Sequence, residues 1–278
     1  MRCIPTATEI ETYRRDGFVA IPDLLNEPET AVLDVAVEAA MTSMGKVKST
    51  GEGGTGYTDG KPWIDEEESY YANALHQRIN LWRISEVVKQ RMLGPELGEF
   101  TARLAGIGGV RCYHDQALYK PAWGNPTSWH LDNPIWSFTS PDAISVWIAL
   151  DEATVQNGCL WYLPGSHRLV DRRNAGIDGN FGDLPRRVQP QIADIPPVSV
   201  PLPRGGAVFH NGLTAHAAGC NISNRPRRAM TCAYMPEGSV FNGNTSILPP
   251  SYVKTLNIGD VLDNEAWVPL VWSQRAAG

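Results

Sequence analysis

Trp129-His130-Leu131-Asp132 places an imidazole and a carboxylate two positions apart near the middle of the chain. Because side chains alternate along a strand, the two groups would point to the same side of a strand. Such a pair can hold one face of a metal ion if a third ligand arrives from elsewhere in the chain. The competing interpretation is a surface histidine beside a turn aspartate, and these four residues alone do not separate the two.

A second histidine with suitable surroundings lies far downstream. His216 is followed by the small residues Ala217, Ala218 and Gly219, which permit close backbone approach, and Arg227 follows on the next expected strand. Two imidazoles and one carboxylate on one face of a metal, with the opposite positions open, form the arrangement of non-haem Fe(II) oxygenases. A guanidinium group pairs bidentately with a carboxylate, so a nearby arginine suits a dicarboxylic cosubstrate.

The other four histidines fit other roles. His76 lies in a polar, helical context and is expected at the surface, and His167 lies in a turn where it is expected to hydrogen-bond locally. His210 ends an apolar strand, either as a core residue or as a neighbour of the metal ligands. His114 and Asp115 are adjacent, so on a strand they face opposite ways and cannot share one ion. His114 is therefore assigned to the pocket wall or the core.

Size and composition describe a globular chain that can bury a sizeable core. Its 278 residues are 42% hydrophobic and 19% charged, with a formal net charge of -6, so no basic field favours nucleic acid or an anionic membrane. No apolar run approaches the roughly 20 residues of a membrane span, and the N-terminus lacks the apolar core of a signal peptide. We therefore expect a cytoplasmic protein. Five widely spaced cysteines indicate neither a disulfide framework nor a zinc site.

The secondary-structure pattern changes character near residue 106. Capping signals at Thr8 and Asn26 and a break at Gly94-Pro95 predict that residues 1–105 are mainly helical. The following residues predict short strands, at 110–119, 143–150, 160–163, 198–202, 207–210 and 229–235. We expect one domain over residues 1–278, a β-sandwich or barrel with helices packed outside it.

Two segments interrupt this pattern. The glycine-rich stretch at 49–60 is expected to be a loop, either a flexible linker or, with slight preference, a lid over a pocket. Residues 168–191 form a polar insertion that begins with Arg168 and carries four further arginines, Arg172, Arg173, Arg186 and Arg187. We expect these arginines in solvent, with contact to an acidic substrate as the alternative.

The central motifs together resemble the phytanoyl-CoA dioxygenase family of Fe(II)/2-oxoglutarate-dependent oxygenases. The matching pieces follow the order and spacing of the family, at residues 116–121, 129–132, 146–151, 157–160, 163–167 and 216–228. Residues 16–19 and 259–262 also resemble the family, so the resemblance covers most of the chain. It implies a mainly β fold with flanking α-helices, built on a double-stranded β-helix (jelly-roll, cupin-like) over residues 106–278. It also implies that His130, Asp132 and His216 bind Fe(II) and form the catalytic centre.

The resemblance further implies a cosubstrate site. Arg227, eleven residues after His216, would pair with the far carboxylate of 2-oxoglutarate. Gln116 and Trp147 match positions that line this site, and Lys120 is a further candidate. Ala218 departs from members that carry a hydroxyl residue there, which removes one hydrogen bond to the cosubstrate.

By the same resemblance, the chain consumes 2-oxoglutarate and O2, forms succinate and CO2, and oxidises, most simply hydroxylates, a small-molecule metabolite. Asp132 favours oxygenation, because related halogenases lack this carboxylate. Desaturation, epimerisation and cyclisation remain alternatives, as do a cupin-type oxygenase without 2-oxoglutarate and a non-catalytic metal- or ligand-binding β-barrel. The expected substrate wall comprises Trp129, Asn133, Trp136 and His114, which suits a secondary metabolite or a small amino-acid-like compound better than a fatty acyl thioester. The oligomeric state stays open.

Overall fold

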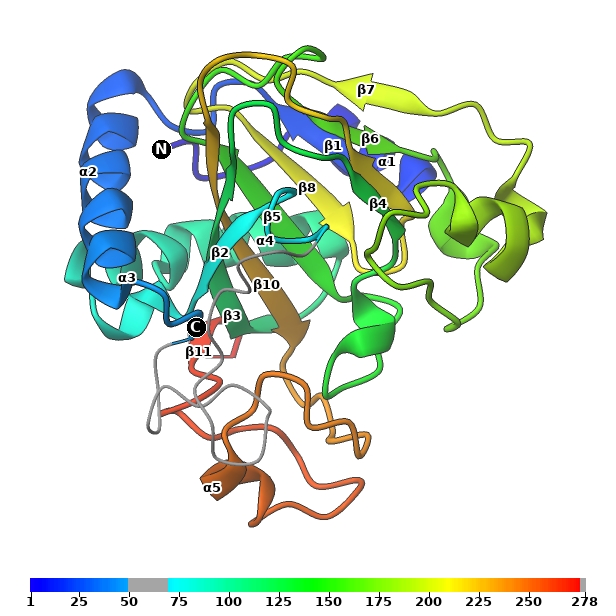
Figure 1. Ribbon diagram of the computed structural model, residues 1–278. Coiled ribbons are helices and arrows are strands. Elements are labelled where there is room, and N and C mark those ends of the chain that lie inside the picture. Colours follow the sequence, from blue (N-terminus) through cyan, green and yellow to red (C-terminus); the bar gives the residue numbers. More distant parts are fainter. Residues whose placement is uncertain (50–69, 276–278) are drawn as a thin grey trace.

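Two antiparallel β-sheets lie face to face in the computed structural model, which describes residues 1–49 and 70–275. Within these ranges the larger sheet has seven strands in the order β1-β8-β5-β10-β3-β11, with β2 also paired to β3. The smaller sheet has four strands in the order β4-β9-β6-β7. The two sheets enclose a hollow in the manner of a double-stranded β-helix (Figure 1). This is the expected fold class.

The strand bounds agree closely with the runs expected from the sequence. The larger sheet comprises β1 (Phe18–Ile21), β2 (His76–Ile79), β3 (Gly109–Lys120), β5 (Ile144–Ala149), β8 (Ala207–Asn211), β10 (Arg227–Pro236) and β11 (Leu270–Ser273). The smaller sheet comprises β4 (Thr127–His130), β6 (Leu160–Tyr162), β7 (Val198–Val200) and β9 (His216–Ala218). One expectation was wrong: the residues from His76 onward form a strand and not a helix, because they pair with the edge of β3. His76 itself is exposed, as expected.

Helices cover the outer face of the larger sheet (Figure 1). They are α1 (Ala7–Asp16), α2 (Glu27–Met44), α3 (Glu86–Met92) and α4 (Pro95–Ala105), and the short α5 (Pro250–Val253) lies near the C-terminal end. The capping box at Asn26 and Glu29 and the break at Gly94-Pro95 are confirmed. The first capping box is Thr6 with Glu9, and not Thr8 as expected, because the two reciprocal hydrogen bonds form earlier in the chain.

Alternation along the central strands separates two interiors. On β5, Ile144, Val146 and Ile148 face the helices and join the core beneath them, where the Phe100 and Phe209 rings stack with centroids 5.1 Å apart. The intervening Ser145 and Trp147 face the space between the sheets. The outer face of the larger sheet therefore packs against the helices, and the side chains of its inner face line the space between the two sheets.

A β-bulge sets the direction of the side chains on β3. Against β10, His114 pairs with Ala233 and Cys112 pairs with Tyr234, so Tyr113 is an extra residue between them. Beyond the bulge, His114 and Gln116 point into the space between the sheets. Asp115 points outward and accepts hydrogen bonds from the amides of residues 81 and 82. His114 and Asp115 therefore lie on opposite faces, as expected.

The polar insertion at 168–191 packs against the outer face of the smaller sheet. Ala175 and Leu184 are buried beside the outward-facing Trp129 and Leu131, and the amide of Leu131 donates to Asn174 Oδ1 at 3.1 Å. The four arginines that follow Arg168 in the insertion are exposed, as expected. The predicted lid at 49–60 lies outside the described residues, apart from Ser49.

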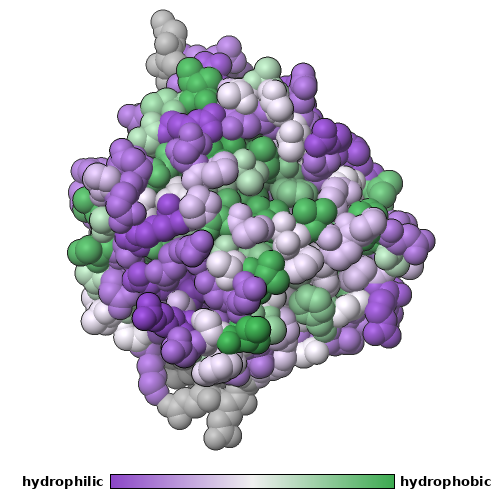
Figure 2. All heavy atoms as spheres, turned by 90° about the horizontal axis from the view of Figure 1, so that it is seen from above, coloured by the Kyte–Doolittle hydropathy of each residue, from purple (hydrophilic) through white to green (hydrophobic). Residues whose placement is uncertain are grey.

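The surface offers no membrane-spanning element in the part of the chain that the structure describes. None of the helices there is both long enough and apolar enough to cross a bilayer. From above, hydrophobic residues show as small groups in the middle of the face and at several of its edges, interspersed with hydrophilic ones (Figure 2). This mixture is ordinary for a globular protein surface.

Candidate functional site

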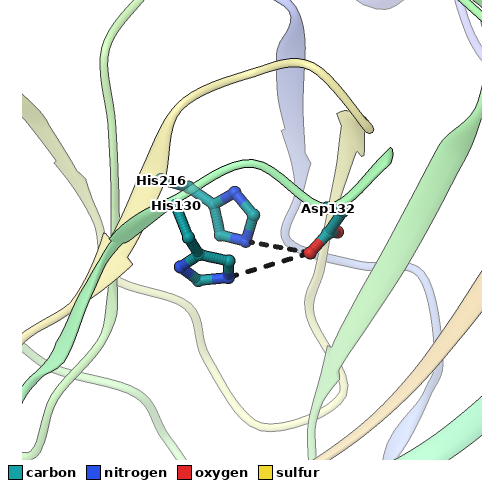
Figure 3. Close-up of side chains that lie close together, drawn as sticks. All are labelled: His130, Asp132 and His216. Atoms are coloured by element: carbon teal, nitrogen blue, oxygen red, sulfur yellow. Dashed lines mark ion pairs between the residues drawn. The ribbon is translucent and has the colours of Figure 1, made fainter. Parts of the chain in front are cut away.

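Two strands of the smaller sheet bring the two candidate histidines together. His130 ends β4, His216 begins β9, and the two residues are direct partners in the antiparallel pairing of these strands. Their ring centroids are 4.1 Å apart. Asp132 lies just beyond the end of β4, in a turn with φ -78° and ψ -54°, so the expectation that it shares a strand with His130 was wrong. The turn nevertheless directs its carboxylate toward both imidazoles (Figure 3).

The three side chains form a compact set of metal-ligand atoms. Asp132 Oδ1 lies 3.7 Å from His130 Nε2 and 3.8 Å from His216 Nε2. One donor atom from each residue falls within 4.8 Å of the other two. These separations are those of ligands that surround one ion, because each can lie about 2 Å from a common centre.

Hydrogen bonds and burial prepare both imidazoles as ligands. Nδ1 of His130 lies 2.8 Å from the carbonyl of Ser128, and Nδ1 of His216 lies 3.0 Å from the carbonyl of Thr214. Because a carbonyl only accepts, each Nδ1 carries the hydrogen and each Nε2 keeps its lone pair for a metal. Burial lowers the pKa of both histidines and so favours the neutral form that binds metal.

The carboxylate carries the negative charge of the site. Burial by itself would raise the pKa of Asp132, but the neighbouring His216 and the hydrogen bond from His210 outweigh it, so the pKa lies below its ordinary value. Two neutral imidazoles and one ionised carboxylate are the donor set that suits Fe(II), with three positions left for other ligands. The residues present therefore fit the metal.

A cavity of about 680 Å³ between the sheets contains the three ligands and also Arg227. Arg227 begins β10 and is only 1% exposed. Its Nη2 donates to the carbonyl of Gly158 at 3.2 Å, and its Cζ lies 4.9 Å from the centre of the Trp147 ring. Its Nε has no hydrogen-bond partner among the described residues. Burial lowers its pKa to about 10, so the guanidinium group remains charged at neutral pH.

Among the described residues, no carboxylate forms an ion pair with Arg227. Its neighbour Arg228 faces the other way and pairs with Asp34 and Asp151. A buried, unpaired cation is costly to the fold unless an anion arrives. Arg227 and the iron ligands in one cavity therefore fit a dicarboxylate that spans the distance between them.

Three of the four residues expected in the cosubstrate site, Arg227, Gln116 and Trp147, line this cavity, and so does Ala218. Lys120 does not line it, which corrects that expectation. The Lys120 ammonium group donates to the main-chain carbonyls of Ala74 at 3.1 Å and Asn125 at 2.5 Å. These hydrogen bonds connect the Lys120 side chain to the segment before β2 and to the turn after β3, so it has a structural role.

Two of the four residues expected in the substrate wall, Trp136 and His114, line the cavity. Trp129 does not, because on β4 it is the neighbour of the inward-facing His130 and so points outward into the insertion, with its ring 6.2 Å from that of Phe181. Asn133 is also absent from the cavity wall, since its side chain bonds the main chain of residues 138 and 140.

Sequence reasoning missed two turns and the supporting side chains of Ser145 and Tyr162, and it left His210 open between the core and the neighbourhood of the metal ligands. Residues 174–177 of the insertion and 244–247 after β10 both line the cavity, and no local pattern marks them. Oδ2 of Asp132 lies 3.2 Å from Ser145 Oγ and 3.1 Å from His210 Nε2, and Tyr162 Oη lies 3.0 Å from His210 Nδ1. A histidine in the otherwise apolar strand β8 was the one signal in the sequence, and it proves to be a neighbour of a metal ligand.

Acid is expected to destabilise the metal-free protein in part through His114. Burial lowers the pKa of this side chain from 6.5 to about 4. Between these values the folded state binds fewer protons at His114 than the unfolded chain does, so stability is lost as pH falls through this window. From pH 7 to pH 5 the loss from this one group is about 2 kcal/mol.

The measurement is the free energy of unfolding in urea at pH 7 and pH 5. His114→Gln should lose about 2 kcal/mol less than the wild type on acidification, by the same proton linkage. His76→Gln, a substitution of an exposed histidine, is the matched control and should behave like the wild type. Equal acid sensitivity of His114→Gln and wild type would contradict a buried, neutral His114.

Known proteins resemble this chain in sequence and in fold. The profile of the family described as Phytanoyl-CoA dioxygenase (PhyH) matches residues 13–229. A Caenorhabditis briggsae protein, the phytanoyl-CoA dioxygenase domain-containing protein 1 homolog, is 24% identical over 259 residues, covering 81% of this chain and 89% of its own.

Two solved structures cover nearly the whole chain. The non-haem alpha-ketoglutarate-dependent carbocyclase SnoK from nogalamycin biosynthesis superposes with a TM-score of 0.76 at 27% identity, covering 96% of both chains. The epimerase SnoN, in complex with Fe3+, alpha-ketoglutarate and nogalamycin RO, has a TM-score of 0.72 at 23% identity and covers 95% of this chain and 97% of its own. With the histidine–aspartate–histidine triad in place, the chain belongs to the phytanoyl-CoA dioxygenase family of Fe(II)/2-oxoglutarate-dependent oxygenases.

Proposed function

We propose that this oxygenase hydroxylates a small-molecule metabolite. In that reaction one oxygen atom of O2 enters a C–H bond of the substrate, and the other enters succinate as 2-oxoglutarate loses CO2. The observation that carries the proposal is the buried Arg227, which has no carboxylate partner among the described residues and lines the same cavity as the metal triad. Bound iron with 2-oxoglutarate supplies the oxidising power, and the protein supplies binding, orientation and exclusion of water.

We assign the residues of this chain to two ends of the cavity. At one end Arg227 would bind the distal carboxylate of 2-oxoglutarate through its free Nε and its fork of donors, with Trp147 against the guanidinium plane. Gln116 also lines the cavity. At the other end, Trp136 and His114 would face the substrate, together with the turns at 174–177 and 244–247.

The charges on the cavity wall support an uncharged substrate. Among the described lining residues, Arg227 and Asp132 carry the charges, and the remaining side chains other than histidines are neutral. Burial lowers the pKa of His114 and so keeps this side chain neutral too. The arginines of the insertion, which were the alternative contact for an acidic substrate, are exposed on the outside. A carboxylate, phosphate or thioester–nucleotide substrate would have no second cation among the described lining residues, because Arg227 is assigned to the cosubstrate.

Ring closure or epimerisation is the second candidate outcome. It is favoured by the likeness to SnoK, described as a carbocyclase, and to SnoN, described as an epimerase, both of which cover nearly the whole chain. Both outcomes use the same metal site and cosubstrate, so they differ only in how the substrate is held. The products separate them: hydroxylation adds one oxygen atom, cyclisation removes two hydrogen atoms, and epimerisation leaves the mass unchanged.

The test is succinate formation by purified protein with Fe(II), 2-oxoglutarate and O2, with and without a panel of neutral polycyclic metabolites, amino acids and acyl-CoA thioesters. We expect slow succinate formation without substrate, and faster formation with a neutral metabolite. Oxidation of a substrate without any use of 2-oxoglutarate would indicate a cupin-type oxygenase instead. No binding and no consumption of 2-oxoglutarate would indicate a non-catalytic β-barrel and overturn the proposal.

A further inference from the structure

The outer oxygen of the metal-binding carboxylate is held by an ordered set of buried side chains. Asp132 Oδ1 faces the two imidazole ligands, while Oδ2 turns away from them toward β5 and β8. There it lies 3.1 Å from Nε2 of His210 and 3.2 Å from the hydroxyl of Ser145. His210 is 4% exposed, and Tyr162 behind it is fully buried.

The partners of His210 define how its two nitrogens are used. An ionised carboxylate only accepts hydrogen bonds, so His210 Nε2 must carry a hydrogen and donate it to Oδ2. In a neutral ring Nδ1 is then an acceptor, and the Tyr162 hydroxyl at 3.0 Å donates to it. Tyr162 is itself fixed by stacking on Phe18, with centroids 4.3 Å apart and an interplanar angle of 12°. The Tyr162 hydroxyl therefore completes the hydrogen bonds of the ring form of His210 that Asp132 requires.

We propose that His210 and Tyr162 are positioning residues that restrict Asp132 to binding the metal through one oxygen. With Oδ2 engaged by two donors, chelation through both oxygens would require breaking buried hydrogen bonds, which is costly. One-oxygen binding leaves a further coordination position for 2-oxoglutarate or O2. The proposal rests on the metal site of the proposed function, and it adds that His210 and Tyr162 determine how Asp132 binds the metal.

The geometry argues against His210 as a metal ligand of its own. The set of ligand atoms that lie within 4.8 Å of one another comprises His130, Asp132 and His216 in the described part of the chain, and His210 is outside it. Its Nε2 is hydrogen-bonded to Oδ2 of Asp132, and its Nδ1 is hydrogen-bonded to the hydroxyl of Tyr162. Its strand, β8, belongs to the larger sheet, opposite the strands that carry the two histidine ligands.

The experiment is a titration of the metal-free, full-length protein with Co(II), followed by calorimetry and by the visible absorption of the bound ion. Four variants are compared: His210→Leu removes the donor, His210→Gln restores an N–H donor of similar reach, Tyr162→Phe removes only the hydroxyl, and Tyr119→Phe is the control. Tyr119 donates its hydroxyl to Glu38, away from the cavity, so its variant loses one hydrogen bond of the same kind. Melting temperatures of the metal-free variants report folding separately.

We expect His210→Leu to bind Co(II) about 10- to 100-fold more weakly, as is typical for loss of a residue that supports a metal ligand. The spectrum of its complex should change as the second oxygen of Asp132 joins the metal. His210→Gln should recover most of the affinity and the wild-type spectrum, and Tyr162→Phe should fall between, less than about 10-fold below wild type. Tyr119→Phe should match the wild type.

Wild-type affinity and spectrum in His210→Leu would overturn the proposal, and so would a Gln variant as weak as the Leu variant. If His210→Leu fails to fold, Tyr162→Phe decides, since unchanged affinity and spectrum there would equally overturn it. Failure of the proposed function looks different. If the wild type binds Co(II) and the variants behave as expected, but 2-oxoglutarate is never consumed, the proposed function is refuted and this inference stands. If the wild type binds no Co(II), both are overturned.

Discussion

Replacing Asp132 with alanine is expected to weaken Fe(II) binding by more than about 100-fold and to abolish 2-oxoglutarate turnover, since even residues that only support a metal ligand contribute 10- to 100-fold. The carboxylate is the one anionic donor of the triad, and it lies 3.7 Å and 3.8 Å from the two imidazole nitrogens. Its loss leaves two neutral ligands, which hold Fe(II) poorly. His130→Ala should have the same effect. Competition with a coloured chelator measures the affinity, and succinate formation measures the turnover.

Asp142→Ala is the matched control, because Asp142 is an exposed aspartate in the segment that leads from this turn into β5. It should bind Fe(II) and form succinate as the wild type does. Both active-site variants should keep their secondary structure, because neither side chain belongs to the main hydrophobic core. Undiminished turnover in His130→Ala would show that the site assignment is wrong.

Replacing Arg227 with alanine is expected to raise the 2-oxoglutarate concentration needed for half-maximal turnover roughly 100-fold, with a smaller effect on iron binding. Truncating one partner of a buried charge pair costs about 2–5 kcal/mol, and about 3 kcal/mol corresponds to this factor. The free protein should not lose stability in proportion, because its guanidinium group has no anionic partner among the described residues. Initial rates over a range of 2-oxoglutarate concentrations provide the measurement.

Two further substitutions sharpen this result. Arg225→Ala removes an exposed arginine two residues away, just before β10, and should leave the 2-oxoglutarate requirement unchanged. Arg227→Lys keeps the charge but loses the planar fork of donors, so it should lie between alanine and wild type. If Arg225→Ala raised the requirement as much as Arg227→Ala, the effect would be one of surface charge and not of a dedicated carboxylate site.

The fold class was predictable from local helix and strand patterns, and the metal triad from the order and spacing of motifs spread over residues 116–228. Alternation along β3 likewise predicts that His114 and Asp115 face opposite ways, and they do. The same rule, applied to His130, excludes Trp129 from the cavity, since the neighbour of an inward-facing residue on a strand points outward. The aromatic character of Trp129 suits a pocket wall, but strand geometry decides where its ring lies.

The other differences concern contacts between segments far apart in sequence. Lys120 lies on the same strand as Gln116, but its ammonium group reaches the carbonyl of Ala74, 46 residues away, as well as that of Asn125 in the turn after β3. The support of Asp132 by His210 and Tyr162 joins a turn, β8 and β6. Such contacts follow from how the two sheets close on each other, and a single sequence contains no register between sheets.

The central claim is that one cavity holds Fe(II) on the triad and 2-oxoglutarate between that metal and Arg227. An anaerobic titration of 2-oxoglutarate into metal-free and Fe(II)-loaded protein tests it most directly, by calorimetry and by visible absorption. We predict that a single molecule binds per chain, much more tightly with Fe(II) present and with a new charge-transfer band, and that Arg227→Ala weakens this binding. Binding that is indifferent to both Fe(II) and Arg227 would contradict the claim.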